Sequence, residues 1–365
     1  KEMERPEDAI ASYREAIALQ PDFAEAHHNL GKVLRDQGRS DDAVASYRRA
    51  IEIRPEYAQA HHNLGTVLRN LGRLDLSVTS HRKAIDINPD MDAAHNNLGL
   101  ALQEQGLAED ALDSFRKALA INPDFVKAQA NLANALKDLG RLEDAAAAYG
   151  KALAADPDFA EVHYNLGLVH LLKGDFDNGW REYDWRWRMQ DFPSRRAEFD
   201  QSLWDGGDLN GKTILLYPEQ GFGDTVQASR YLPLVAARGG CVVLESPASL
   251  VRLFGTLDGV DQLIESGDPL PPFDCHAPLM DLPRLFRTNL NTILDTLPHG
   301  KSYLSTDPDL MQKWADRFGP KQDIRVGVTW AGNPVHRNDR NRSMDPTLLR
   351  PLTEIPGISL FSLQV

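Results

Sequence analysis

The residues best suited to chemistry lie in one short stretch, 219–225, directly after an apolar run at 214–217. The apolar run predicts a buried strand of a parallel sheet. Gly221 and Gly223 allow a sharp turn before a helix whose N-terminal N–H groups favour anions. This stretch therefore predicts an anion-binding turn with the carboxylate of Asp224 at its edge, and the rest of the chain has to position it.

Further polar residues follow the same turn. Thr225 stands with Asp224 where the helix should begin, and Gln220, Gln227 and Arg230 are secondary candidates for contacting a ligand. Each of these side chains has an equally simple structural interpretation, because aspartate and threonine are common helix caps.

The overall composition limits the possible partners. The chain has 365 residues, which favours two or more domains, and its 42% hydrophobic and 25% charged residues are typical of a folded protein. A net charge of −13 argues against a broad nucleic-acid footprint or an anionic membrane surface. Cys241 and Cys275 cannot form a disulfide framework, and neither a membrane-spanning run nor a signal peptide is visible. We therefore expect a cytoplasmic protein.

The first half of the chain repeats itself every 34 residues. The positions that keep this step include Leu30, Leu64, Leu98, Leu132 and Leu166, and Pro21, Pro55, Pro89, Pro123 and Pro157. Each unit predicts two helices, such as 24–37 and 41–53, which pack closely where small residues like Gly31 and Ala50 lie. Such hairpins stack on one another into a superhelix.

These residues resemble tetratricopeptide repeats, with five repeats from about residue 24 to residue 184 and half of an earlier one at the start. In that family the first helix of each repeat lines the concave surface. One column of this surface is always asparagine: Asn29, Asn63, Asn97, Asn131 and Asn165. Amides carry donors and acceptors, so such a ladder can bind an extended peptide backbone, as the similar solenoid of O-linked N-acetylglucosamine transferases implies. The alternative is a soluble consensus residue.

Two other features of the repeats have structural interpretations. His27, His61, His95 and His163 share one repeat position, but equivalent residues in stacked helices are roughly 8–10 Å apart, too far to share one metal ion. At the junction, Arg186 replaces a repeat alanine, and Trp180, Tyr183 and Trp187 predict one apolar stripe. We expect a capping helix there, with a peptide- or sugar-stacking tryptophan as the alternative.

The period changes after residue 211. Predicted strands at 213–217, 241–245, 262–264 and 325–330 alternate with helices at about 225–238, 248–256 and 307–318. This pattern indicates a parallel sheet covered on both faces, with ligands at the carboxyl ends of its strands. The predicted organisation is a repeat superhelix at 1–190, a connector at 191–211, a Rossmann-like domain at 212–320 and the incomplete start of another domain at 321–365.

The motifs Glu-Gln-Gly-Phe-Gly-Asp-Thr at 219–225 and Val-Thr-Trp-Ala-Gly-Asn-Pro at 328–334 resemble glycosyltransferases of the heptosyltransferase type, which have the two-domain GT-B fold. Together with the repeats, the chain is similar to bacterial tetratricopeptide proteins carrying a glycosyltransferase-like domain. The resemblance implies that Asp224 is the base that deprotonates an acceptor hydroxyl group. A helix cap is the alternative for Asp224.

The same resemblance implies a donor site in the loop after residue 330. Its candidate residues are His336, Asn338, Asp339, Arg342 and Ser343. Arg342 matches a basic residue that approaches the donor diphosphate, although the loop departs from the family's Lys-Arg-Trp pattern, and a solvated charged loop is the alternative. Because the chain stops at Val365, we expect a truncated donor half and inefficient turnover.

The leading hypothesis is a fragment of a nucleotide-sugar-dependent glycosyltransferase whose repeats recruit a protein or glycan acceptor. It needs no tightly bound cofactor and no metal, and its donor substrate is a nucleotide sugar. The alternative is a non-catalytic interaction scaffold with a degenerate glycosyltransferase-like domain.

Overall fold

The computed structural model describes residues 6–189, 192, 199–297, 302–319, 323–332 and 343–363. The chain forms two compact units. The first contains Lys1–Asp200 and Met280–Leu294, and the second contains Gln201–Leu279 and Asp295–Val365. A segment that the sequence assigns to the α/β part, Met280–Leu294, thus belongs to the helical unit.

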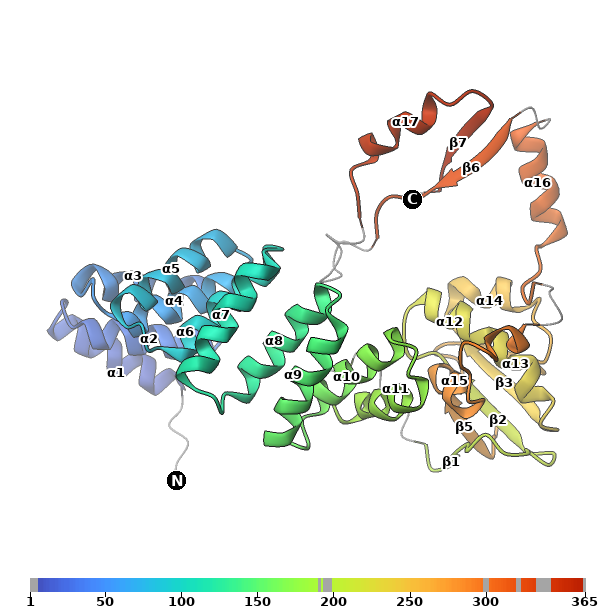
Figure 1. Cartoon of the computed structure of the whole chain (residues 1–365), viewed down its shortest axis with the longest axis horizontal. Helices are drawn as coiled ribbons and strands as arrows, with labels where there is room; N and C mark the ends of the chain where they lie inside the picture. The colour runs from blue at the N-terminus through green and yellow to red at the C-terminus, as the bar shows by residue number, and fades with distance from the viewer. Residues whose placement is uncertain are drawn as a thin grey trace. The chain divides into compact units, whose positions relative to one another are not determined.

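The helical unit is a row of antiparallel helix pairs (Figure 1). Its helices are α1 (Pro6–Leu19), α2 (Ala24–Asp36), α3 (Ser40–Ile53), α4 (Ala58–Asn70), α5 (Leu74–Ile87), α6 (Asp92–Glu104), α7 (Ala108–Ile121), α8 (Val126–Asp138), α9 (Leu142–Ala155), α10 (Ala160–Leu172), α11 (Phe176–Tyr183) and the 3₁₀ helix η1 (Asp184–Arg188). The predicted 24–37 and 41–53 helices agree with α2 and α3 to within one residue. Each hairpin turns at a left-handed glycine with φ between 71° and 85°: Gly38, Gly72, Gly106, Gly140 and Gly174.

The two helices of each repeat approach closely because a small residue faces a ring. A Cβ atom on Gly31 would lie 2.8 Å from the Tyr47 ring, and one on Gly99 would lie 2.6 Å from the Phe115 ring. Tyr47 and Phe115 are fully buried in two apolar clusters that run through the repeats. The predicted close packing of the helices is therefore confirmed.

The second unit contains a five-stranded parallel sheet in the order β1-β5-β2-β3-β4. Its strands are β1 (Ser202–Leu203), β2 (Thr213–Tyr217), β3 (Cys241–Ser246), β4 (Gln262–Glu265) and β5 (Cys275–Pro278). Between consecutive strands lie α12 (Phe222–Ala228), η2 (Ser229–Tyr231), α13 (Leu232–Ala236) and α14 (Ala248–Phe254). Three strands match the prediction closely. The sequence missed β5, whose four residues are Cys-His-Ala-Pro, and the two-residue β1.

The same unit also holds a separate pair of parallel strands, β6 (Ile324–Val328) and β7 (Ile358–Ser362). They are accompanied by α16 (Pro308–Phe318), η6 (Pro346–Leu349) and α17 (Arg350–Thr353), and none of the described residues in these five elements is buried. The remaining short elements are η3 (Leu279–Asp281), α15 (Leu282–Leu285) and η4 (Ile293–Thr296). Within the described ranges, no helix has the length and apolar character needed to cross a bilayer.

Candidate functional site

The turn between β2 and α12 differs in detail from the prediction. The helix begins at Phe222, with Gly221 as its N-cap, so Asp224 lies at the third helical position rather than at the start. Neither Gly221 nor Gly223 has a positive φ. The Asp224 carboxylate reaches back and accepts a 3.2 Å hydrogen bond from the Gly221 N–H, and the Thr225 hydroxyl donates to the Gly221 carbonyl at 3.0 Å. Both side chains therefore stabilise the first turn of α12.

This turn lies at the carboxyl end of β2, between β3 on one side and β5 on the other. From β2 the chain continues to β3 and β4 on one side of β2, whereas β5 pairs with β2 on its other side. The turn after β2 therefore lies at a topological switch point of the sheet. Gly223 and Gln227 are exposed, and no heavy atom lies within 4 Å of the position of a Cβ atom on Gly223. Arg230 is half-buried in η2, one turn further along.

Most of the second predicted loop lies outside the described residues, namely His336, Asn338, Asp339 and Arg342. Ser343 is described, and its hydroxyl oxygen accepts a 2.8 Å hydrogen bond from the Gly332 N–H. Ser343 thus joins the two ends of this loop.

The asparagine column forms hydrogen bonds between neighbouring repeats. The amide of Asn63 lies 2.8 Å from His28 Nε2, and that of Asn97 donates to the Thr66 hydroxyl at 3.2 Å. Further along, Asn131 donates to Asn96 Oδ1 at 2.9 Å, and Asn165 Oδ1 accepts from Lys137 Nζ at 3.2 Å. Burial lowers the pKa of His28, and a hydrogen bond from the neighbouring Asn29 opposes part of this shift. All five asparagines are half-buried.

Three of these asparagines share one hollow of about 320 Å³. It is lined by Asn96, Asn97, Leu100, Lys127, Ala130, Asn131, Asn134, Tyr149, Phe159, Glu161, Val162 and Asn165. The Tyr149 hydroxyl donates to Asn134 Oδ1 at 2.5 Å, which fixes the amide orientation. Because an amide has two donor hydrogens and two acceptor lone pairs, one inter-repeat bond leaves it capacity for a ligand.

The repeated histidines have a structural task. The Nε2–H groups of His27, His61, His95 and His163 donate to the carbonyl of the proline six residues earlier, at 2.9–3.0 Å. Each bond ties the loop that enters a repeat to the first helix of that repeat. In the part of the chain that is described, no group of three His, Cys, Asp or Glu side chains could hold a metal ion.

The tryptophans at the junction do not form the single stripe that the sequence predicted. The α-helix ends at Tyr183 and continues as the 3₁₀ helix η1, so Trp187 is no longer in register with Trp180. Trp185 stacks on the His163 ring at 3.7 Å between ring centroids, and His163 Nδ1 lies 2.5 Å from Glu182 Oε2. The junction is thus packed onto the last repeat, which agrees with a capping role.

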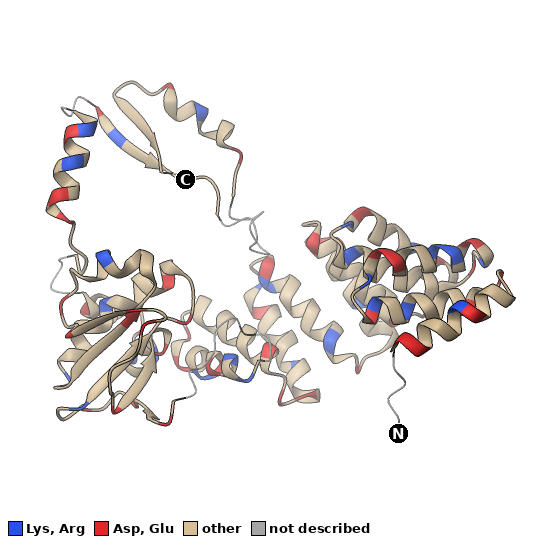
Figure 2. Ribbon diagram, turned by 180° about the vertical axis from the view of Figure 1, so that it is seen from behind, with Lys and Arg blue, Asp and Glu red and all other residues tan. Residues whose placement is uncertain are grey.

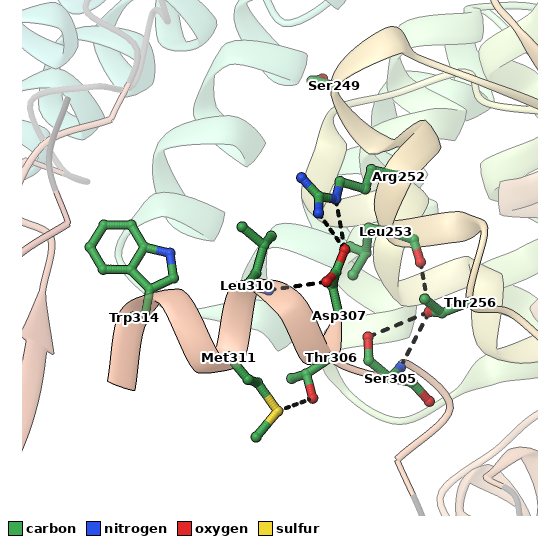
Figure 3. Close-up of a pocket in the computed structure, with 10 residues that line it drawn as sticks. All are labelled: Ser249, Arg252, Leu253, Thr256, Ser305, Thr306, Asp307, Leu310, Met311 and Trp314. Atoms are coloured by element: carbon green, nitrogen blue, oxygen red, sulfur yellow. Dashed lines mark hydrogen bonds and ion pairs between the residues drawn. The ribbon is translucent and has the colours of Figure 1, made fainter. Parts of the chain in front are cut away.

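A groove of about 590 Å³ between α14 and α16 was not anticipated from the sequence (Figure 3). Leu253 and Leu310 form its wall, and Trp314 projects from the far end of α16. Asp307 caps α16 by accepting hydrogen bonds from two backbone N–H groups and also accepts from Arg252 of α14. The apolar residues at 310, 311 and 314 have the spacing of one helix face, and this pattern could have indicated the groove.

Comparison with known families identifies the repeats. "TPR repeat" models match residues 2–38, 31–72 and 133–174, and "Tetratricopeptide repeat" models match 56–124 and 114–147. The first 170 or so residues are therefore a tetratricopeptide-repeat solenoid, as the sequence predicted. The parallel sheet and helices of the second unit are compatible with an α/β domain.

Similar proteins cover about half of this chain. Protein FlbA of Caulobacter vibrioides is 27% identical over 221 residues, which cover 54% of this chain and 35% of FlbA, so the match spans about a third of that relative. The solved structure of YrrB, described as a TPR protein with an unusual peptide-binding site, is 21% identical with a TM-score of 0.41, covering 47% of this chain and 89% of YrrB. Pseudomonas aeruginosa pilF is 21% identical with a TM-score of 0.44, covering 48% of this chain and 81% of pilF.

Proposed function

We propose that the concave face of the repeats binds an extended segment of a partner protein. The observation that carries this proposal is the hollow in which Asn97, Asn131 and Asn165 lie together, each with unused hydrogen-bonding capacity. A peptide backbone repeats one donor and one acceptor per residue, which matches a ladder of amides.

The residues that line the hollow favour binding of the peptide backbone over recognition of charged side chains. Its walls are mostly amide and apolar, and Lys127 and Glu161 contribute one charge of each sign. Acidic and basic residues are interspersed along the helices of the repeats (Figure 2). The proposed ligand is therefore a neutral or mixed-charge segment in extended conformation.

The experiment selects ligands from a random library of linear twelve-residue peptides with the full chain. Hydrogen exchange then shows which amides become protected when a selected peptide is added. Protection confined to α6, α8 and α10 supports the proposal. Protection elsewhere, or failure to select any peptide, contradicts it.

We also infer a second function for the α/β unit, transfer of a sugar from a nucleotide-sugar donor to a hydroxyl group, with Asp224 as base and Arg342 beside the donor diphosphate. What favours it is the position of the β2–α12 turn at a switch point of a parallel sheet, where such folds bind ligands. The partner bound by the repeats would be the acceptor. The competing proposal is a non-catalytic scaffold in which Asp224 serves only the first turn of α12.

Substitution of Asp224 by asparagine separates these two roles. An amide oxygen still accepts the hydrogen bond from the Gly221 N–H, but it cannot act as a base. Asp224→Asn and Asp224→Ala are compared with the wild-type chain in transfer and hydrolysis assays with UDP-, GDP-, ADP- and CMP-sugars. Turnover that Asp224→Asn abolishes with unchanged thermal stability supports catalysis. If neither binding nor turnover is seen with any of these donors, the result favours the non-catalytic scaffold.

A further inference from the structure

The hollow on the concave face lies where one repeat lacks a side chain that other repeats have. The residues at this repeat position, 34 residues apart, are His28, His62, Asn96, Ala130 and Tyr164. Alanine is the smallest of them, and Ala130 lines the hollow of about 320 Å³ described above. The repeat of Ala130 therefore has space where its neighbours place a larger group.

In three repeats the group at this position is a ring that packs against a ring of the second helix. The pairs, with the distances between their ring centroids, are His28–Tyr47 at 5.7 Å, His62–His81 at 5.3 Å and Tyr164–Tyr183 at 5.3 Å. A ring is thus the usual occupant of this place in the chain.

The first repeat shows which groups surround such a ring. The His28 ring lies 4.9 Å from the ring of Tyr57, and its Nε2 atom lies 2.8 Å from the amide nitrogen of Asn63. The residues equivalent to Tyr57 and Asn63 three repeats later are Phe159 and Asn165, and both line the hollow. The hollow therefore offers the same two contacts, a ring and an amide, to a side chain from outside.

Both contacts are open to a ligand. Phe159 and Asn165 are partly exposed, whereas Tyr149, which is equivalent to Tyr47, is fully buried and orients Asn134. Asn165 Oδ1 accepts from Lys137, but among the described residues none accepts a hydrogen bond from Asn165 Nδ2, and this nitrogen is not shielded from solvent. The amide can therefore donate to an acceptor atom of a ligand, as Asn63 does to His28.

We infer that the hollow binds one aromatic side chain of the partner segment, a ring with a hydrogen-bond acceptor at its edge. The inference rests on the proposed function of the concave face, because the bound segment carries the ring. Histidine and tyrosine meet this description, and they are the ring-bearing residues that the chain itself has at this repeat position. Phenylalanine lacks the acceptor for Asn165. The asparagines bind the backbone, and the hollow adds selection of one side chain.

Side-chain analogues test the hollow without a peptide. The full chain is titrated with 4-methylphenol, with 4-methylimidazole and with 3-methylbutanol, which has a hydroxyl group but no ring. Binding is followed by the resonances of the Asn165 side-chain amide. At about pH 8.5, where the imidazole is neutral, we expect both ring compounds to bind at millimolar concentration and to shift these resonances, and 3-methylbutanol to leave them unchanged.

The pH dependence tests the acceptor. At about pH 5 the protonated 4-methylimidazole has two donors and no acceptor, so its binding should be lost, whereas that of 4-methylphenol should persist. Resonances of Asn165 that neither ring compound shifts, or that 3-methylbutanol shifts equally, would overturn the inference.

Variants tie the binding to the place of Ala130. Ala130→His supplies the ring that the first repeat has, and His28 shows that the repeat accommodates it, so thermal unfolding should change little. We expect the affinity for 4-methylphenol to fall about tenfold or more, because the inserted ring fills the hollow. Ala147→His, on an exposed position of α9, is the matched control. Equal affinities of these two variants would contradict the inference, as would an unchanged affinity of Asn165→Ala.

A library-selected peptide separates the inference from the function on which it rests. Replacement of one histidine or tyrosine of the peptide by alanine should lower its affinity about tenfold or more. A peptide that protects α6, α8 and α10 and binds equally well without any ring would contradict the inference and leave the proposed function intact. Binding of the ring analogues without selection of any peptide would support the ring site and contradict the proposed function.

Discussion

Arg186 and Asp281, which are 95 residues apart in the chain, form an ion pair inside the helical unit. The Arg186 side chain is completely shielded from solvent, and its guanidinium group also lies over the rings of Tyr183 and Trp187 at 4.5 and 4.4 Å. Every earlier repeat has alanine at this position, from Ala16 to Ala152. The pair fixes the Met280–Leu294 segment to the end of the repeats.

Replacement of Arg186 by methionine should therefore be strongly destabilising. Methionine fills much of the space but leaves Asp281 and Asp184 with a single cation, Arg284. Loss of one partner of a buried ion pair costs about 3–5 kcal/mol. The denaturant dependence of unfolding measures this change, with Arg188→Met as the control because Arg188 is exposed. Similar unfolding free energies for the two variants would contradict a structural role of the pair.

His81 should make the repeats sensitive to acid. It occupies the position of Tyr47 and Phe115, is fully buried, and neither of its ring nitrogens has a hydrogen-bond partner among the described residues. Burial, aided by His62 and Arg69, lowers the pKa of His81 to about 3. In the unfolded chain the histidine binds this proton near pH 6.5. The free energy of unfolding is therefore highest above that pH, and at lower pH it decreases by up to about 1.4 kcal/mol per pH unit.

His81→Phe should remove this pH dependence and raise stability at neutral pH, since phenylalanine fills the same space at Phe115. The unfolding free energies of wild type and variant are compared at pH 7.5 and at pH 5. Their difference should grow as the pH falls. A difference that is independent of pH would show that His81 is not the buried group responsible.

The close packing of the helices predicts that two glycine substitutions lower the unfolding free energy by different amounts. A Cβ atom on Gly167 would meet the Tyr183 backbone nitrogen at 2.6 Å, which only a shift of α11 can relieve. One on Gly99 would meet the Phe115 ring at the same distance, but a side chain can move, and Ala133 already occupies this position in the next repeat. We expect Gly167→Ala to lower the unfolding free energy by about 1–3 kcal/mol.

Gly99→Ala should lower the unfolding free energy less, because the Phe115 ring can move away whereas the backbone of α11 cannot. The gain of about 1 kcal/mol from replacing a helical glycine by alanine applies to both variants. Thermal unfolding of both variants gives the comparison. Equal losses of stability would indicate that the contact with the backbone of α11 is not tighter than the contact with the Phe115 ring.

The repeats could be predicted because their sequence pattern is periodic. When the same type of residue recurs every 34 positions, its structural role can be inferred from the equivalent positions in the other repeats. Local turns were predictable for the same reason, as the left-handed glycines at Gly38 and Gly72 show. The strand β2 was also clear, since a run of large apolar residues is bounded on both sides.

Contacts between distant residues were not predictable in this way. Nothing near Arg186 in the sequence indicates its partner Asp281, and the arginine looked like a break in the repeat. Asp224 was placed at the start of a helix, but Gly221 took the cap position because an aspartate three residues later can reach back to its N–H.

The most direct test of the account measures how tightly one library-selected peptide binds to the wild-type chain and to the triple variant Asn97→Ala/Asn131→Ala/Asn165→Ala. Asn70→Ala, which removes an exposed asparagine outside the column, is the control. If the asparagines bind the peptide backbone, the triple variant loses about a hundredfold or more in affinity, at roughly 1 kcal/mol per hydrogen bond. Apart from the ring that enters the hollow, alanine substitutions along the peptide should then change the affinity little. Unchanged affinity of the triple variant would contradict the proposed function of the concave face.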